Sequence, residues 1–572
     1  MKKLLLLLLS LVLMAGLAAC AVTNAEDRQS ALTVNGDAVT VDADGTYTIT
    51  TGGTYELSGT LDGQIWIDAK EETVTLILNG VDIKSGLSSA IYIQKAEAVT
   101  IELAEGSENR LSDAADYTYD DQAEEEPDGT IFSKSDLVIQ GTGSLEIQAN
   151  HSYAIRTKDA LTIATGTYEI TSADTGIRAG DSVTIAGGDL TITSGNDGIR
   201  ASNDTDETLG WVLVSGGTIR ISAACDGIQA ETDLTVTGGT IEIATSGAIA
   251  GDDTSAKGLK AGGNIAISGG EMTLNTDDDG VHANGNVSVV DGTLTISSGD
   301  DGMHADADMT VSGGTVTITQ SYEGIEGKNL VISGGTIHIT SSDDGLNAGG
   351  GADGSSFGRM GANTFASGSD YSLEISGGFI VIHAQGDGVD SNGDLTISGG
   401  VTLVSGPTSD GNGAMDSGDG ATFKVTGGIL IAAGSSGMAE TPGGTSTQNS
   451  ISVGLTGSAG ELVSIADANG NVLYAFSPEK AYANVLISAP DITTGETYTV
   501  CLGGTASGLD ADGYQKAGSV SGGQAVGSAT VGSYLSTIGN VSTSGFGGMN
   551  DWNRQGGQMP SGQMPGGQRP GY

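Results

Sequence analysis

The stretch that decides the fold is Asn329–Ser342, which reads "NLVISGGTIHITSS". Apolar and polar residues alternate on both sides of a glycine pair, a pattern that predicts two short strands with one buried face. Gly334 and Gly335 supply the backbone freedom that a tight corner needs. The same pattern occurs in "DLTVTGGTIEIATS" at 233–246 and in "NVSVVDGTLTISSG" at 286–299. The chain is therefore built from repeats.

The repeat has a fixed length. A second glycine serves as its marker, and successive markers lie 22 residues apart or close to that, apart from a few insertions, at Gly176, Gly198, Gly227, Gly258, Gly280, Gly302, Gly324, Gly345 and Gly388. A unit this short cannot bury its apolar face alone, whereas stacked parallel units share one core. The sequence thus predicts an all-β, right-handed parallel β-helix of about 22 residues per coil. Propellers and sandwiches are the alternatives, but they favour longer units and more aromatic residues than the 4% found here.

The repeat also divides the chain. The expected parts are a lipoprotein signal peptide at 1–20, a linker at 21–30, irregular coils at 31–150, regular coils at 151–440, a small β-strand cap at 441–521, and a disordered tail rich in Gly, Met, Pro and Gln at 522–572. A cap is expected because the last coil of a stack leaves an open strand edge. The tail composition is typical of disorder.

The net charge of the chain indicates which kinds of ligand it can bind. Lys and Arg number 22 against 71 Asp and Glu, for a net charge of −49. Nucleic acid and anionic membrane surfaces are excluded as partners, and a cation is favoured. Cys225 and Cys501, whose pairing the sequence leaves open, are too few to staple a chain of this length.

The N-terminus predicts export. "MKKLLLLLLSLVLMAGLAAC" has two lysines, an apolar run and small residues before a cysteine, as secretory signals do. Its last four residues resemble the lipobox of bacterial lipoproteins, in which the cysteine is lipidated. An ordinary signal peptide is the alternative. We expect a monomer anchored to the bacterial membrane through Cys20 and exposed at the cell surface.

Acidic residues recur at the marker corners, as in "DDGVHA" at 278–283 and "DDGMHA" at 300–305. Carboxylates stacked about 5 Å apart repel by roughly 1 kcal/mol per pair even in water, so their column favours a bound cation. Several anionic oxygens are what Ca²⁺ prefers. The candidate calcium ligands are Asp278, Asp279, Asp300, Asp301, Glu323, Glu326, Asp343, Asp344, Asp387 and Asp390. Turn chemistry explains a single Asp-Gly pair equally well.

One run carries a family likeness. "SYEGIEGKNLVISGGTIHITSSDDGLNA" at 321–348 resembles the signature of bacterial carbohydrate-binding-domain proteins, and "GTYELSGTLDGQIWIDA" and "LILNGVDIKS" look like segments of the same family. The resemblance implies secreted or lipid-anchored parallel β-helices, similar in shape to pectate lyases, that bind calcium and acidic polysaccharides. An insertion, "GGGADGSSFGRMGANTFASGSD", departs from the pattern and lengthens one corner.

The predicted function is calcium-dependent binding of acidic glycans of the pectin or polygalacturonate kind, without catalysis. An acidic protein holds an acidic sugar through a shared cation or through basic side chains, and the candidate carbohydrate contacts are Arg178, Arg200, Lys257, Lys260, His282 and His304. The histidines could instead ligate a transition metal.

Two alternatives remain open from the sequence. A calcium-dependent polysaccharide lyase would use Lys257 or Lys260 to remove a proton from the sugar. A structural stalk or adhesin would use calcium only for rigidity.

Overall fold

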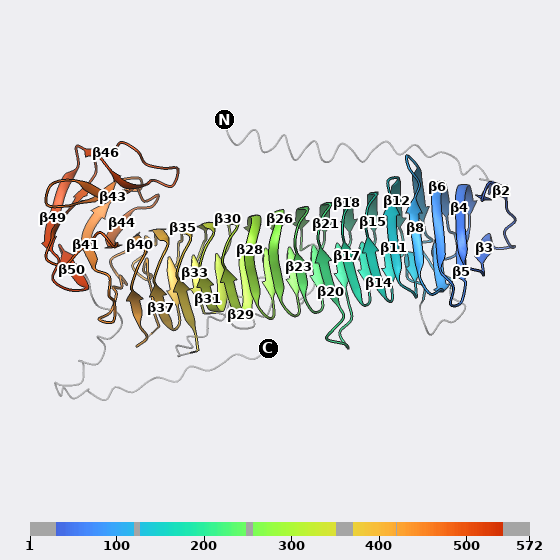
Figure 1. The fold of residues 1–572 in the computed structure, drawn as a ribbon, viewed down its shortest axis with the longest axis horizontal. Coiled ribbons are helices and arrows are strands. Elements are labelled where there is room, and N and C mark those ends of the chain that lie inside the picture. Colours follow the sequence, from blue (N-terminus) through green and yellow to red (C-terminus); the bar gives the residue numbers. More distant parts are fainter. Residues whose placement is uncertain (1–29, 119–125, 248–254, 350–369, 419, 542–572) are drawn as a thin grey trace, which may run out of the picture.

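The computed structural model describes residues 30–118, 126–247, 255–349, 370–418 and 420–541. Within these ranges the regular elements are strands, and no helix occurs. The strands form a long stack in which the chain advances steadily from one end to the other (Figure 1). The C-terminal strands gather at the end of the stack opposite the first coils (Figure 1).

Over much of the stack, strands three apart in sequence pair in parallel, so three consecutive strands make one coil. From β25 (Leu259–Ala261) to β33 (Leu346–Ala348) most partners are two apart, because some strands run through a corner. In the middle of the stack β13 (Tyr153–Thr157) pairs with β16 (Ile177–Ala179), β14 (Ala160–Ile163) with β17 (Ser182–Ile185), and β15 (Thr167–Ser172) with β18 (Asp189–Ser194). Equivalent residues of successive repeats are direct neighbours, as His282 and His304 show. The coils present three faces.

The site face is built from β5 (Gln64–Asp68), β7 (Ile91–Lys95), β10 (Gly129–Ser133), β13, β16, β19 (Ile199–Ala201), β22 (Ile228–Ala230), β25 (Leu259–Ala261), β27 (Val281–Ala283), β29 (Met303–Val311), β31 (Ile325–Ile332), β33 (Leu346–Ala348) and β36 (Val389–Ser391). The second face contains β6 (Val74–Lys84), β8 (Val99–Leu103), β11 (Leu137–Gly141), β14, β17, β20 (Trp211–Val214), β23 (Leu234–Val236), β26 (Ile265–Thr276), β28 (Val287–Ser298), β34 (Ser372–Ile375), β37 (Asp394–Ile397) and β39 (Phe423–Val425). The third face contains β9 (Glu108–Ser112), β12 (Ser144–Ala149), β15, β18, β21 (Thr218–Ala223), β24 (Thr240–Thr245), β30 (Thr315–Gln320), β32 (Thr336–Thr340), β35 (Phe379–His383), β38 (Val401–Ser405) and β40 (Ile429–Gly434).

Both ends carry further strands. The first coils begin with β1 (Thr33–Val34), β2 (Asp37–Ala38), β3 (Thr46–Ile49) and β4 (Gly53–Asp62). The last coil is covered by β41 (Ser450–Gly457), β44 (Tyr482–Ser488) and β50 (Leu535–Ile538). Beside them lie a five-stranded sheet and a small two-stranded sheet, made of β42 (Val463–Ala466), β43 (Val472–Phe476), β45 (Thr497–Leu502), β47 (Tyr514–Gly518) and β49 (Gln524–Thr530), and of β46 (Thr505–Ala506) and β48 (Val520–Ser521).

The predicted fold class needs correction. In place of an open right-handed β-helix, the strands of the stack form one continuous sheet, 43-stranded over the described residues, that closes around the core and is mostly parallel. The faces merge because β26 pairs with both β23 and β24, running through its glycine corner without a break. Antiparallel strands extend the same sheet at both ends, at β1 with β4 and at β40 with β44. Repeat spacing identifies neighbours between coils, but it does not reveal whether a corner interrupts the sheet.

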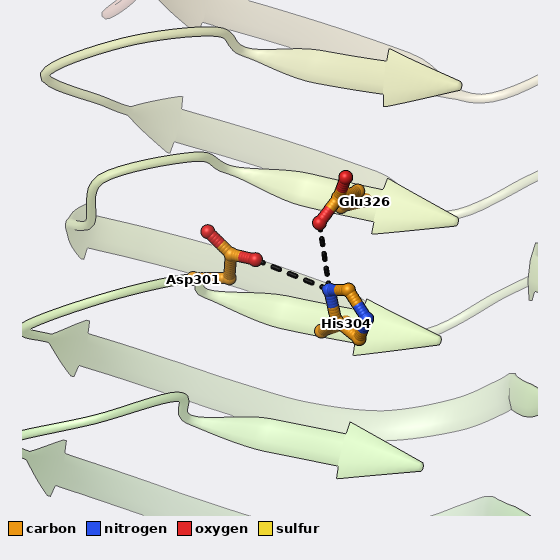
Figure 2. A group of neighbouring side chains, drawn as sticks. All are labelled: Asp301, His304 and Glu326. Atoms are coloured by element: carbon orange, nitrogen blue, oxygen red, sulfur yellow. Dashed lines mark hydrogen bonds and ion pairs between the residues drawn. The ribbon is translucent and has the colours of Figure 1, made fainter. Parts of the chain in front are cut away.

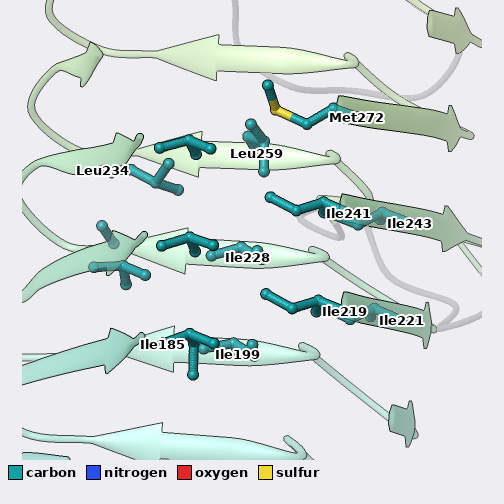
Figure 3. Packing of buried hydrophobic residues seen from close by; sticks show 14 of the residues in the cluster. Ile185, Ile199, Ile219, Ile221, Ile228, Leu234, Ile241, Ile243, Leu259 and Met272 are labelled. Carbon is teal, nitrogen blue, oxygen red and sulfur yellow. The ribbon is translucent and has the colours of Figure 1, made fainter. Parts of the chain in front are cut away.

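The core explains why the repeat is strict. Isoleucine, leucine and valine from all three faces fill the interior in columns, as Ile199, Ile228 and Leu259 do (Figure 3). Marker glycines sit where coils approach most closely. A Cβ on Gly280 would lie 2.5 Å from Ile296 Cγ2 and 2.6 Å from the Gly302 carbonyl oxygen. The glycine of the Asp-Asp-Gly corner is therefore required by packing between coils.

The C-terminal boundary also differs from expectation. Disorder was predicted from residue 522, but β49 and β50 lie in this stretch, where β49 pairs with β45 and β50 with β41. Alternating small and β-branched residues suit these strands despite the low hydrophobicity. The signal peptide, Cys20, the long insertion and the end of the tail lie outside the described residues. Among the described residues no helix is long and apolar enough to cross a membrane.

Candidate functional site

One outer column of side chains runs along the whole site face. Between core-facing neighbours, each coil contributes one residue in register with the next, in the order Trp66, Tyr92, Phe132, Arg156, Arg178, Arg200, Gln229, Lys260, His282, His304, Glu326, Asn347 and Asp390. We call this the outer column. Its chemistry changes along the stack from aromatic, through basic, to acidic.

A second row of side chains, the corner column, stands beside it at the marker corners. Its members are Asp197, Asp226, Lys257, Asp279, Asp301, Glu323, Asp344 and Asp387. Most of its aspartates accept a hydrogen bond through one oxygen from the backbone N–H one coil further on, as Asp226 Oδ1 does from Lys257 at 2.8 Å and Asp279 Oδ1 from Asp301 at 2.9 Å. We call this series of hydrogen bonds the ladder. It fixes each carboxylate through Oδ1, so the charge on Oδ2 must be compensated by another group.

Basic side chains neutralise the first half of the corner column. Arg200 lies 3.3 Å from Asp197 Oδ2, and Lys260 lies 3.1 Å from Asp226 Oδ2. The Lys257 ammonium contacts Asp279 at 2.5 Å and Asp278 at 3.0 Å, and its side chain is fully buried. Burial would raise the pKa of Asp279, but Lys257, with help from His282, outweighs it and holds that pKa well below 3.8.

Two histidines follow in the outer column. The rings of His282 and His304 are stacked, with centroids 4.9 Å apart and planes 6° from parallel. Figure 2 shows His304 between Asp301 on its own coil and Glu326 on the next, with Nδ1 at 3.2 and 2.7 Å from their carboxylates. Burial would lower the pKa of His304, but its hydrogen bonds to Asp301, Asp306 and Glu326 raise it well above 6.5. Both ring nitrogens of His304 thus lie against carboxylates, Nε2 against Asp306 and Nδ1 against Asp301 and Glu326.

After Glu326, the carboxylates of the two columns are no longer paired with basic side chains of the described residues. Asp344, Asp387 and Asp390 bring carboxylate oxygens within 4.8 Å of one another, and within the described ranges no basic side chain pairs with any of them. Burial, followed by repulsion from Asp390, raises the pKa of Asp387 to about 8. Burial and repulsion from Asp416 raise the pKa of Asp390 to about 7. We call Asp344, Asp387 and Asp390 the acidic triad.

An uncharged side chain, Asn347, stands next to Asp390 in the outer column. Asn347 is 1% exposed and lies in the outer column between Glu326 and Asp390. Its Nδ2 donates to Glu323 at 2.7 Å, which leaves its Oδ1 as the remaining polar atom of the side chain. That oxygen is buried and has no hydrogen-bond partner. Three carboxylates and one unsatisfied carbonyl oxygen suit a hard divalent cation.

The structure separates the predicted calcium ligands into groups with different surroundings. Asp278, Asp279 and Asp300 cluster beside Lys257, and Asp301 and Glu326 cluster around His304. Glu323 contacts Asn347, and Asp343 is hydrogen-bonded to the Tyr322 hydroxyl. The remaining candidates, Asp344, Asp387 and Asp390, form the acidic triad. Of these groups, the acidic triad is the one that could hold a metal without a competing basic side chain among the described residues.

The predicted carbohydrate contacts also divide by exposure. Lys257, His282 and His304 are buried, with 0, 4 and 0% of their surface exposed, and each contacts an aspartate of the corner column. Arg200 and Lys260 have side chains 29 and 24% exposed, and both are ion-paired.

Arg178 differs from its neighbours. Its Nη1 donates to the Tyr153 hydroxyl at 2.5 Å, its Nε donates to Ser202 at 3.2 Å, and its guanidinium lies 5.2 Å from the Tyr153 ring centre. The other arginines of the described chain, Arg110, Arg156, Arg200 and Arg220, each pair with a carboxylate, whereas Arg178 makes no ion pair there. A positioned, partly exposed guanidinium without a counter-ion suits a carboxylate ligand.

Sequence reasoning missed the first part of the outer column. Trp66 and Tyr92 have ring centroids 4.7 Å apart, and Tyr92 and Phe132 are 5.5 Å apart. Arg156 follows them and pairs with Asp128 at 3.8 Å. The marker glycine is absent from these coils, and an acidic insertion in the sequence, "DAADYTYDDQAEEEPDG" at 113–129, breaks the spacing. Alignment on aromatic residues between inward isoleucines, as in "IWI" and "IYI", could have extended the column.

The fold and site define an elongated all-β protein with an extended, chemically graded face. The family described as carbohydrate-binding domain-containing protein matches residues 43–302 and 301–507, and the chain belongs to this family. A solved structure, described as the polysaccharide lyase-like protein from C. thermocellum in a gadolinium derivative, is 29% identical over 48% of this chain and 92% of that one, with a TM-score of 0.34. No curated protein matches the chain.

Proposed function

We propose that this carbohydrate-binding protein is a non-catalytic binder of acidic polysaccharides whose binding depends on calcium held at the acidic triad. The observation that supports it most is the change of counter-ion along the corner column. Protein cations serve Asp197, Asp226 and Asp279, whereas Asp344 and Asp387 have none among the described residues. The column therefore needs an added cation at one end only.

Calcium fits this end by its chemistry. The acidic triad and Asn347 Oδ1 are hard oxygen donors, and Ca²⁺ takes 6 to 8 of them. Because these residues supply fewer, water or a uronate carboxylate completes the shell. Asp387 and Asp390 are partly exposed, which leaves access from solvent. Calcium thus lets an acidic protein bind an acidic sugar.

Arg178 provides the other polar contact. It lies in the same outer column as Asp390, several coils away, so a glycan that lies along the column meets a free guanidinium before the calcium site. The ligand proposed on this basis is a pectin or polygalacturonate-like chain.

The alternatives find less support. A lyase base must reach the sugar, and Lys257 is fully buried between Asp278 and Asp279, while Lys260 is paired with Asp226. We also propose that the chain is exported, anchored through a lipid on Cys20 at the cell surface, and monomeric. A structural stalk or adhesin, the other alternative, would bind calcium for rigidity but would bind no glycan.

Binding of polygalacturonate, measured by affinity electrophoresis in calcium and in chelator, tests the function. We expect retardation only in calcium, loss of retardation in Asp387→Asn, and no unsaturated product in an ultraviolet assay. Retardation that is unchanged by chelator would refute the calcium bridge, and unsaturated product would show a lyase. Calcium-induced stabilisation without binding to any acidic glycan would favour the stalk.

A further inference from the structure

We propose a second sugar subsite, for an uncharged sugar unit, in the cavity beside Trp211. This cavity of about 350 Å³ lies on the second face, between the loop 202–210 and strands β20 and β23. Its walls include Trp211, Leu213, Thr232, Asp233, Glu207 and Thr208. The inference stands on this cavity alone and does not depend on calcium or on the outer column.

The cavity is preformed because the loop that walls it is held by its own hydrogen bonds. Asn203 Oδ1 accepts from the backbone N–H groups of Thr205 and Asp206, each at 3.1 Å. At its far end the Gly210 N–H donates to the Asp181 carbonyl at 2.6 Å. A rigid loop reduces the entropy that a ligand would otherwise lose on binding.

The polar groups of the cavity present acceptors. The Thr208 hydroxyl donates to Asp206 at 2.7 Å and the Thr232 hydroxyl donates to the Leu209 carbonyl at 2.6 Å, so both oxygens offer lone pairs. Asp233 Oδ1 accepts from Asn264 at 2.9 and 3.0 Å, which fixes the carboxylate in place. With Glu207, the lining therefore selects a ligand rich in hydroxyl donors.

The indole and the charges complete the selection. Trp211 is partly exposed at the start of β20, and its ring offers an amphipathic surface for the C–H face of a sugar. A uronate carboxylate here would meet Glu207 and Asp233, each repelling it by about 1 kcal/mol at 4 Å in water. The cavity thus takes an uncharged sugar, the opposite of the ligand proposed for Arg178 and the acidic triad.

Tryptophan fluorescence tests the proposal with the full exported chain in chelator. Short uncharged oligosaccharides of glucose, xylose, mannose and galactose are titrated separately, with oligogalacturonate as the charged comparison. We expect saturable quenching by at least one uncharged series and none by oligogalacturonate. Trp66→Phe, which leaves the cavity intact, should keep the quenching, and Trp211→Phe should lose it.

Calorimetry on variants separates binding from a local spectral effect. Glu207 is exposed, so Glu207→Gln should fold normally and bind the active sugar several-fold more weakly, while Trp211→Ala should weaken binding more than tenfold. No binding of any uncharged series, or binding that survives Trp211→Ala, would overturn the proposal. Equal binding of oligogalacturonate in chelator would also overturn it.

Discussion

We expect the acidic triad to make the stability of the metal-free protein fall as pH rises. The pKa of Asp387 is about 8 and that of Asp390 about 7, against 3.8 for an ordinary aspartate. Between pH 4 and pH 7 the folded, metal-free protein therefore binds more protons than the unfolded chain at these groups. Stability is highest below the ordinary aspartate pKa and is lost as pH rises through 7 and 8, at about 1.4 kcal/mol per pH unit for each extra proton held.

Calcium should reverse this loss. It binds the ionised triad and not the protonated one, so at a hundredfold excess over its dissociation constant it adds about 2.7 kcal/mol of stability at pH 8 and much less at pH 5. The measurement is the free energy of unfolding from urea titrations at both pH values, in calcium and in metal-free buffer. Asp387→Asn keeps a carbonyl that can accept the Gly413 N–H bond. It should reduce the slope of the free energy of unfolding against pH by the contribution of one bound proton.

A matched control removes the effect of net charge. Glu374→Gln deletes one carboxylate from an exposed position on β34, away from the column, so its pH slope and calcium response should equal those of the unaltered protein. Identical slopes for Asp387→Asn and Glu374→Gln would refute the assignment of uncompensated charge to the triad. A calcium response of equal size at pH 5 and pH 8 would refute it as well.

Other expectations follow from single contacts. Arg178→Gln should weaken polygalacturonate binding in calcium about tenfold without changing the melting temperature. Arg200→Gln removes the partner of Asp197 and should lower the melting temperature as well. Affinity electrophoresis measures the binding, and thermal melts measure the stability. Lys257→Met should cost about 3 to 5 kcal/mol in urea unfolding because Asp278 and Asp279 lose their buried partner, and a cost below 1 kcal/mol would contradict the ion-pair geometry. Gly280→Ala should lower the free energy of unfolding by about 1 to 3 kcal/mol, because its Cβ would press on Ile296 and the Gly302 carbonyl. Gly80→Ala should lower it by about 1 kcal/mol, because a Cβ there meets nothing within 4 Å but φ is 77°.

The repeat was enough to predict which residues of successive coils are neighbours. Spacing of 22 residues placed His282 against His304 and Val281 against Met303, and the structure pairs them so. It could not show the closed sheet, because a corner such as Ser268–Glu271 in β26 has the same glycine pair as corners that interrupt the strand. Nor could it place β50 against β41, a parallel pair joining distant parts of the chain.

For the site, the sequence predicted the residues better than their roles. Column positions identified Asp279 and Asp344 alike as metal ligands, since both precede a marker glycine. What separates them is the Lys257 side chain, which reaches across to Asp279 from the preceding coil, and no spacing rule indicates the direction of a lysine side chain. Burial of Lys257 and His304 was equally hidden, because outward positions of a strand are normally solvated.

The ladder of the corner column explains why aspartate dominates it. An aspartate carboxylate is short enough for Oδ1 to accept the backbone N–H of the next coil while Oδ2 faces the outer column, as in Asp226 and Asp279. Glu323 is one methylene longer, and its Oε2 instead accepts from Asn347 in the outer column. Asn347 precedes Asp390 in the outer column, and among the described residues no basic side chain pairs with the acidic triad that follows. A single longer side chain therefore marks the point in the column after which basic side chains no longer pair with its described carboxylates, next to the triad proposed to bind calcium.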